Sequence, residues 1–385
     1  MASQGYYDTI KNATAFVRNA DSPNKTMSFI ELQQSAQWES GASRWGVPHL
    51  FACRVICADE RDVLPLLESK FDRVDLEKHD PCIRDLVKGP EEDNSTLKDM
   101  PELKIVRKYD GRGSLGYIWA AMGPLLRLDS SFKPSAASQK PQRETRPPSR
   151  YGDFVSSETH VTPLEGRPDT GDSVPSTVGY LETSTAPLVE EYTCRFLNCL
   201  IRCVLNYSQS EDKDTSFIQY RDERLAYGYK VSGDKLVEAI DDGGMEIVDG
   251  NRRTQVVILE AKRSFQTIPG GGGRPTVVNE LLAQVVGEAL ALMRSGETRT
   301  ISNTDVISIV AVKHYIKIFH FKITPQYLRQ FERLRPTQET QDTDTFLHVQ
   351  TTKWFDVSGR KGREYFVRHL IALISWADDI ITGDA

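Results

Sequence analysis

One apolar segment, Thr254 to Arg263, constrains this chain more than any other part of its sequence. It reads Thr-Gln-Val-Val-Ile-Leu-Glu-Ala-Lys-Arg, and its β-branched and aliphatic residues predict a buried strand that ends in charge. Side chains alternate across a strand, so Glu260 and Lys262 share one face, opposite to Leu259. Burying a carboxylate and an ammonium is costly unless they pair, bind a metal or take part in chemistry. The simplest alternative is an ordinary ion pair where the strand returns to solvent.

The composition is typical of a folded, water-soluble protein. The 385 residues are long enough for two or three units, and 26% of them are charged while 39% are hydrophobic. The formal net charge of −6 disfavours a strongly basic, non-specific nucleic-acid binder but leaves room for a local basic patch. The sequence has no apolar stretch of about 20 residues, and its first residues lack a basic region followed by an apolar core, so we expect no secretory signal. We therefore expect an intracellular protein of the nucleus or cytoplasm, without a membrane partner.

The cysteines give no sign of a metal centre or a disulfide framework. They form no Cys-x-x-Cys pair and face no histidines at zinc spacing. We expect buried free thiols in a reducing compartment at all six positions, which are Cys53, Cys57, Cys82, Cys194, Cys199 and Cys203.

Composition divides the chain into three regions. Residues 129–185 are rich in Pro, Ser and charge and predict a disordered linker, because such a segment buries too little apolar area to offset its ordering entropy. Residues 1–128 predict a small α/β region of unknown role. Its expected strands are 49–57 and 103–109, and its expected helices are 61–71 and 117–128, the latter broken near Gly123-Pro124.

Residues 186–385 are patterned more clearly and predict an α/β fold with a central mixed β-sheet flanked by helices. Long amphipathic helices are expected at 187–207, 277–293 and 363–381, with a further helix from Gln326. The expected strands are 224–230, 236–240, 255–261, 306–312 and 316–323, followed by one near 346–357.

A second carboxylate, Asp234, is expected beside Glu260. It follows Val-Ser-Gly at a sharp strand turn, and glycine pairs farther on allow hairpins that would bring the two acids to one sheet edge. Adjacent carboxylates repel and need a cation, and oxygen ligands of this kind favour Mg²⁺ or Mn²⁺. Lys262 beside such a metal would orient a water or stabilise charge on a phosphate. The alternative is that Asp234 is a turn residue next to glycine.

Two helical residues are candidates to complete this site. Glu190 lies on the apolar stripe of its helix, so it points into a site or serves as a favourable charge near the helix N-terminus. Gln284 stands among aliphatic residues and needs partners, so it orients a ligand near Lys262 or bonds to backbone. Candidate phosphate contacts, each equally compatible with ordinary surface, are Arg263, Arg274 and Lys313.

This order of residues resembles the PD-(D/E)XK nuclease-like superfamily, in particular divergent nuclease-like domains of fungal proteins. The resemblance covers residues 185–325 and implies a restriction-endonuclease-like core within 186–385. By the resemblance, Asp234 and Glu260 bind Mg²⁺ or Mn²⁺ and Lys262 assists the attacking water. The helix residues Glu190 and Gln284 would complete the catalytic site. The residue before Asp234 is glycine, where the superfamily usually has proline.

A competing motif, Gly111-Arg-Gly-Ser-Leu-Gly116, matches the Gly-x-Gly-x-x-Gly pattern of dinucleotide-binding folds. Those folds also need an acidic residue about 20 positions on, at the end of a second strand. Here the chain enters the 129–185 region instead, so a turn at a helix entry is the simpler interpretation.

Three functions remain open from the sequence. The first is a metal-dependent phosphodiesterase that acts on DNA or RNA. The second is a catalytically inactive module of the same fold that binds nucleic acid or a protein. The third, a nucleotide-binding enzyme built on Gly111 to Gly116, has the least support.

Overall fold

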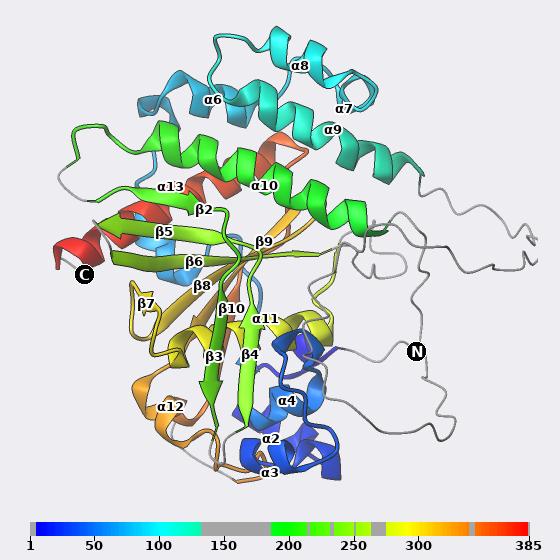
Figure 1. Ribbon diagram of the computed structural model, residues 1–385, viewed down its shortest axis with the longest axis vertical. Coiled ribbons are helices and arrows are strands. Elements are labelled where there is room, and N and C mark those ends of the chain that lie inside the picture. Colours follow the sequence, from blue (N-terminus) through cyan, green and yellow to red (C-terminus); the bar gives the residue numbers. More distant parts are fainter. Residues whose placement is uncertain are drawn as a thin grey trace, which may run out of the picture.

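The computed structural model describes residues 5–131, 186–213, 216–231, 235–249, 252–262, 275–338 and 343–383. Within these ranges the chain is α/β, with a large mixed sheet flanked by helices, as the pattern predicts (Figure 1). Most of the expected linker, residues 132–185, lies outside the described residues.

The main sheet of the described chain runs in the order β1-β10-β9-β8-β6-β5-β2, with β11 paired to β9 and β7 paired to β6. Strands β6 and β8 are parallel, whereas β5–β6 and β8–β9 are antiparallel hairpins. A separate antiparallel hairpin consists of β3 (Ala226–Lys230) and β4 (Leu236–Ile240). The strands of the main sheet are β1 (Val55–Cys57), β2 (Ile218–Arg221), β5 (Gly244–Asp249), β6 (Arg252–Lys262), β7 (Arg299–Thr300), β8 (Asp305–Val312), β9 (Tyr315–Lys322), β10 (Leu347–Thr351) and β11 (Phe355–Asp356).

Helices cover both faces of this sheet. Helices α9, α10 and α13 share one hydrophobic core with the sheet face that carries Val257 and Leu259. Helices α4, α11 and α12 and the β3–β4 hairpin share a second core with the face that carries Ile258. The helices are α1 (Tyr6–Thr9), α2 (Ala13–Asn19), α3 (Phe29–Gln34), α4 (Val47–Ala52), α5 (Glu68–Phe71), α6 (Pro81–Lys88), α7 (Asn94–Leu97), α8 (Glu102–Lys108), α9 (Leu115–Ser131), α10 (Ala186–Ser208), α11 (Asn279–Arg294), α12 (Pro325–Gln330) and α13 (Arg360–Thr382).

The long helices and the central strands lie close to their predicted positions. β4 spans the predicted residues, and β6, β8 and β9 differ from prediction only at their ends. These elements were predictable because β6 and β8 are long apolar runs, and α10, α11 and α13 carry apolar stripes with helical spacing. The expected strand near 346–357 is split into β10 and β11.

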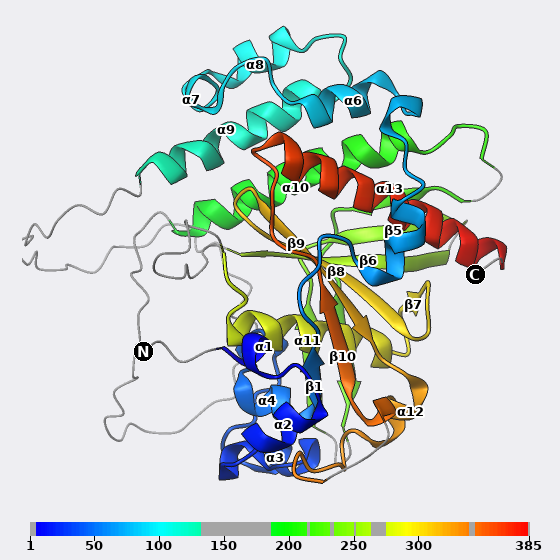
Figure 2. The ribbon, with the colours of Figure 1, turned by 180° about the vertical axis from the view of Figure 1, so that it is seen from behind.

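The N-terminal region packs on the rest of the chain. Its strand β1 pairs in parallel with β10 at the edge of the main sheet, and α1 and α4 lie close to α11 (Figure 2). On the other side of the sheet, α6 and α9 pack on α10 and form an outer layer (Figure 1). Both hydrophobic cores therefore contain residues from the two parts of the sequence.

Several predictions in this N-terminal region were wrong. Residues 103–109 form helix α8 rather than a strand, because Ile105 and Tyr109, four apart, are the buried residues while Leu103 is 59% exposed. Residues 49–57 form the end of α4 and then β1, since Pro48 begins a helix there. The expected helix 61–71 is a 3-10 turn at 65–67 followed by the short α5.

The predicted break at Gly123-Pro124 was also wrong. Helix α9 continues through Pro124, which lies inside it. Met122 and Leu125 are buried on either side, and burying such side chains offsets the roughly 3 kcal/mol that an interior proline costs.

The Gly111–Gly116 motif joins α8 to α9 as a turn, with positive φ angles at Gly111 and Gly113. The element before it is a helix, so the strand–loop–helix context of a dinucleotide site is absent from this described part of the chain. A Cβ atom at Gly116 would lie 3.0 Å from the Cα atom of Val106, so close packing of α8 on α9 accounts for that glycine.

In the part of the chain that the structure describes, none of the helices combines the length and the apolar character that crossing a membrane requires.

Candidate active site

Several elements converge where the parallel strands β6 and β8 end. Lys262, the last residue of β6, pairs with Val312, the last residue of β8. The next residue, Lys313, donates its backbone N–H to the hydroxyl of Thr193 in the N-terminal half of α10, at 3.1 Å. The carboxyl ends of parallel strands in an open sheet are the usual place for a ligand site in α/β proteins.

Four polar side chains lie together between β6 and α11. Glu260 and Lys262 share one face, as predicted, and form an ion pair of 2.6 Å between Oε1 and Nζ. Gln284 donates its amide to the Oε1 atoms of Glu260, at 2.7 Å, and of Glu288, at 2.8 Å. The Lys262 ammonium in turn donates to the Gln284 carbonyl oxygen. The glutamine therefore connects the lysine to both carboxyl groups.

The two carboxyl groups of this cluster, those of Glu260 and Glu288, are buried beside each other. Glu260 is 4% exposed and Glu288 is 1% exposed. Burial raises the pKa of Glu260 to about 7; the Lys262 ammonium opposes this shift and the Asp242 carboxylate adds to it. Burial, together with the neighbouring Glu260 carboxylate, raises the pKa of Glu288 well above its usual value. The pair therefore favours a state in which it retains a proton near neutral pH.

Lys262 is the part of this cluster that reaches solvent, with a side chain 29% exposed. Burial lowers its pKa, but the carboxylates of Glu260, Glu288 and Asp242 outweigh burial, so the pKa is raised. The side chain is therefore an ammonium at neutral pH. In this cluster it is a hydrogen-bond donor and a positive charge.

Asp242 supplies a further carboxylate at the same strand end. Its Oδ2 atom accepts the backbone N–H of Ala261, the residue between Glu260 and Lys262, at 2.9 Å. Burial raises the pKa of Asp242 and the charge of Glu190 adds to the shift, against the opposing effects of Ala261 and Arg224. Asp242, in the turn between β4 and β5, is thus close enough to Glu190 for that charge to raise its pKa, and it raises the pKa of Glu260 in the same way.

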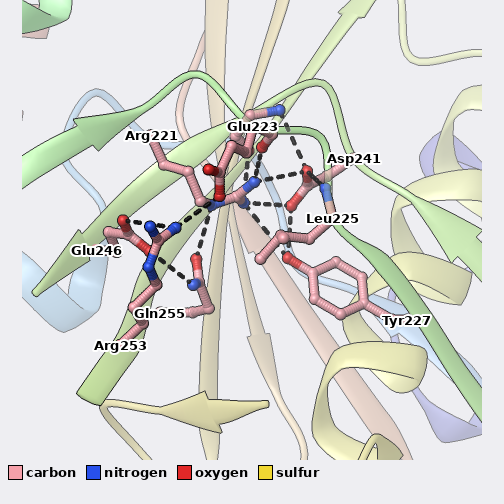
Figure 3. A network of polar contacts seen from close by, with 9 residues as sticks. Arg221, Glu223, Leu225, Tyr227, Asp241, Glu246, Arg253 and Gln255 are labelled. Carbon is pink, nitrogen blue, oxygen red and sulfur yellow. Dashed lines mark hydrogen bonds and ion pairs between the residues drawn. The ribbon is translucent and has the colours of Figure 1, made fainter. Parts of the chain in front are cut away.

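The buried ion pair between Arg221 and Asp241 fixes the turn between β4 and β5, which we call the corner and which carries Asp242 (Figure 3). The Arg221 guanidinium contacts both carboxylate oxygens of Asp241, at 3.1 and 2.5 Å, and the Tyr227 hydroxyl donates to the same carboxylate at 2.5 Å. Arg221 also donates to the Gly243 carbonyl at 3.1 Å. Its contacts at residues 241 and 243 therefore lie on either side of Asp242 and restrict where that side chain can point.

The same network reaches the strands behind the corner. Arg221 donates from Nε to the Gln255 side chain at 3.1 Å, and Gln255 donates to Glu246 at 3.2 Å. These residues belong to β2, β6 and β5, so the ion pair ties three neighbouring strands together (Figure 3). A buried arginine with its carboxylate and its remaining donors satisfied is the arrangement that makes such a pair tolerable.

Two glycines allow this arginine to lie against the backbone. Gly243 has a φ of +134°, and a Cβ atom there would lie 2.9 Å from the Arg221 carbonyl oxygen. A Cβ atom at Gly244 would lie 2.4 Å from the Val257 carbonyl oxygen and 2.6 Å from the Arg221 guanidinium. This explains the Asp-Asp-Gly-Gly sequence at 241–244. Asp241 pairs with Arg221, Asp242 accepts the Ala261 N–H, and only glycine leaves room for the close contacts at positions 243 and 244.

The predicted site residues fall into two groups. Glu260, Lys262 and Gln284 contact one another, Glu190 lies near Asp242, and the Lys313 backbone lies beside α10 at the same strand end. The remaining three lie outside the described residues; they are Asp234, Arg263 and Arg274.

Four residues of the site were not predicted. Asp242 follows the predicted strand 236–240 and precedes Gly-Gly, so the turn pattern that selected Asp234 applied to it equally well. Glu288 stands four residues after Gln284, which places both on one face of α11. The sequence carried no comparable signal for Arg221 and Arg224, whose partners are set by the fold.

The oxygen atoms at this strand end fit a hard divalent cation. Asp242 and Glu260 are carboxylates whose charges disfavour each other's ionisation, a repulsion that a cation would relieve. In the described ranges, no group of three or more His, Cys, Asp or Glu side chains is arranged to hold a metal ion by itself. Mg²⁺ commonly takes only one or two carboxylates and completes its shell with water and substrate phosphate.

Comparisons of this chain with protein-family models, with curated proteins and with solved structures find no match. Its function is therefore inferred from the chemistry of the site.

Proposed function

We propose that this protein is a metal-dependent phosphodiesterase that hydrolyses nucleic acid, with a restriction-endonuclease-like core of the PD-(D/E)XK type. The single observation that carries the proposal is the hydrogen bond from the Ala261 N–H to Asp242. It puts an aspartate beside the strand end that carries Glu260 and Lys262. An aspartate next to Glu-x-Lys, with Glu190 and Gln284 on adjoining helices, resembles the residue set expected for that superfamily's site, with Asp242 in the place given to Asp234 by the sequence.

In this proposal Asp242 and Glu260 hold Mg²⁺ or Mn²⁺, which supplies Lewis-acid stabilisation of phosphate charge when it is bound. Lys262, as an ammonium, orients a water or stabilises charge that develops on the phosphate. Gln284 fixes the Lys262 ammonium and the Glu260 carboxylate relative to each other. Glu190 adds negative charge beside Asp242. An intracellular location in the nucleus or cytoplasm would bring such an enzyme to DNA or RNA.

The test is cleavage of labelled single- and double-stranded DNA and RNA with Mn²⁺ or Mg²⁺. We expect metal-dependent cutting by the wild type and a loss of about 100-fold or more in Lys262→Ala, the scale of a lost electrostatic or proton-transfer contribution. Lys322→Ala is the control, since it removes an exposed lysine that pairs in β9 with Asp305, at the opposite end of β8 from Val312, the partner of Lys262.

The result that would overturn the enzyme proposal is a folded wild type that binds metal and leaves every substrate uncut. That outcome would favour the alternative function, a nuclease-fold module that binds nucleic acid or a protein without cleaving it.

A further inference from the structure

We propose that Arg224 is a substrate-binding residue that pairs with Asp242 in the resting protein and turns to a phosphodiester of the bound nucleic acid. This inference rests on the proposed function, because it assigns the contact to the same substrate. In the structure the Arg224 guanidinium lies 3.2 Å from Oδ1 of Asp242, on the oxygen that Ala261 does not use.

The two members of this ion pair differ in exposure. The Arg224 side chain is 47% exposed, whereas the Asp242 side chain is 12% exposed. An exposed guanidinium keeps most of its hydration, so turning away from its carboxylate costs it little. The arginine therefore lies on the solvent side of the site, where a substrate would approach.

The backbone on both sides of Arg224 is held by the buried ion pair described above. Arg221 donates to the Glu223 carbonyl oxygen, and the Leu225 N–H donates to Asp241 at 3.0 Å (Figure 3). One buried pair thus fixes the chain around Arg224 and, through residues 241 and 243, the chain around Asp242. The guanidinium is presented from a rigid base, which limits the conformational entropy lost on binding.

A cation on Asp242 would change the preference of Arg224. A divalent ion and a guanidinium compete for the same carboxylate and repel each other, so binding of one disfavours the other. A phosphodiester beside the metal offers the arginine two anionic oxygens, a partner that suits its planar fork. Arg224 is then available to bind substrate only where the metal has taken its place.

The test compares Arg224→Gln with Arg253→Gln, which removes the same charge from a side chain 52% exposed that pairs with Glu223 and Glu246 instead. Calorimetry gives the Mn²⁺ affinity of each protein. Fluorescence anisotropy in the Lys262→Ala background, which prevents cutting, gives the affinity for short labelled DNA and RNA oligonucleotides across a range of salt.

We expect opposite effects in Arg224→Gln. Its Mn²⁺ affinity rises about two- to fivefold, because a competing surface cation is gone. Its oligonucleotide affinity falls by roughly three- to tenfold, and the slope against the logarithm of salt falls by about one, the signature of a lost phosphate contact. Arg253→Gln changes neither quantity, and Arg224→Lys retains most of the salt slope.

An unchanged salt slope in Arg224→Gln overturns the inference, as does an equal loss in Arg253→Gln. Either result leaves the proposed hydrolysis intact, since that proposal is judged from cleavage by the wild type and Lys262→Ala. A wild-type protein that binds neither Mn²⁺ nor the oligonucleotides overturns both proposals.

Discussion

The Asp242 carboxylate accepts a hydrogen bond from the backbone N–H of Ala261, the residue that separates Glu260 from Lys262. Backbone hydrogen bonds of residues 242 and 243 to Leu259 continue the pairing of β6 beyond Gly244, the first residue of β5, and the Asp242 side chain then bonds to Ala261. The hydrogen bond holds the Asp242 carboxylate beside the end of β6. The metal site we propose therefore combines Glu260, near the end of β6, with Asp242, in the turn between β4 and β5.

Asp242→Asn should remove the response of the protein to metal without unfolding it. The amide oxygen of asparagine still accepts the Ala261 N–H, while the charge that attracts a cation is lost. We expect Mn²⁺ to stabilise the wild type by about 2.7 kcal/mol at a hundred times its Kd, and to have almost no effect on Asp242→Asn. Differential scanning fluorimetry against Mn²⁺ concentration measures this.

Asp234→Asn is the informative companion to that variant. If Asp242 is the metal ligand, Asp234→Asn keeps the Mn²⁺ response of the wild type. If the Mn²⁺ response is instead lost in Asp234→Asn and kept in Asp242→Asn, the metal ligand is Asp234, the residue that the sequence pattern favoured.

Glu288→Gln should stabilise the metal-free protein. Oε2 of Glu288 is buried without a hydrogen-bond partner in the described structure, and its pKa is raised, so folding requires the pair with Glu260 to take up a proton. A raised carboxyl pKa makes stability fall as pH rises from the unfolded value through the folded one. We expect glutamine to add about 1 kcal/mol at pH 8 and little at pH 4.5. Urea unfolding at both pH values measures the difference; a loss of stability at pH 8 would contradict this interpretation.

Tyr227→Phe should loosen the corner that carries Asp242. It removes the hydroxyl that donates to Asp241 at 2.5 Å and leaves a buried acceptor with fewer donors, at a cost of about 1–2 kcal/mol. Because the corner presents Asp242 to Ala261, we expect faster hydrogen exchange of the Ala261 amide relative to the other amides of β6. Exchange followed by NMR or mass spectrometry checks this; uniform acceleration along β6 would mean a loss of global stability only.

Asp305→Asn should reduce stability at neutral pH and lose its effect in acid. Burial alone would raise the pKa of Asp305, but hydrogen bonds from His320, at 2.8 Å, and Thr304 hold it at about 2. The ionised form therefore stabilises the fold above the unfolded pKa, and this contribution disappears as pH falls through about 2. We expect about 1 kcal/mol at pH 7 after allowing for solvent screening, measured by urea unfolding at pH 7 and pH 2.5.

Asp305 is also a remote control for the metal experiments. It begins β8, whereas Val312, the partner of Lys262, ends that strand. Its substitution should leave the Mn²⁺ response unchanged, even though the protein is less stable.

The central part of the fold was predictable because its signals are local. Alternation along β6 placed Glu260 and Lys262 on one face, and the aliphatic residues around Gln284 indicated that this amide needs partners. The short N-terminal elements were harder, because α8 and β1 contain too few residues for one period to dominate and their structure depends on packing against α9 and β10.

The aspartate that we propose as the partner of Glu260 depends on strand register, which the sequence does not state. Asp234 and Asp242 both lie beside glycines near predicted strand ends. The choice of Asp242 follows from the pairing of Gly244 with Ile258, which brings residue 242 beside Ala261. Arg221 lies against Gly243 and Gly244 at this register, a contact between strands that the sequence alone does not reveal.

The pairing of β1 with β10 has a consequence for how the protein is made. At this edge the Arg54 side chain donates to the carbonyl of Thr345, 291 residues later in the chain. At typical translation rates of about 5–20 residues per second, roughly a quarter of a minute to a minute separates the emergence of these two segments from the ribosome. The apolar residues of α4 and β1 are synthesised that long before their partner strand. We therefore expect chaperones that shield exposed hydrophobic segments to bind the nascent chain.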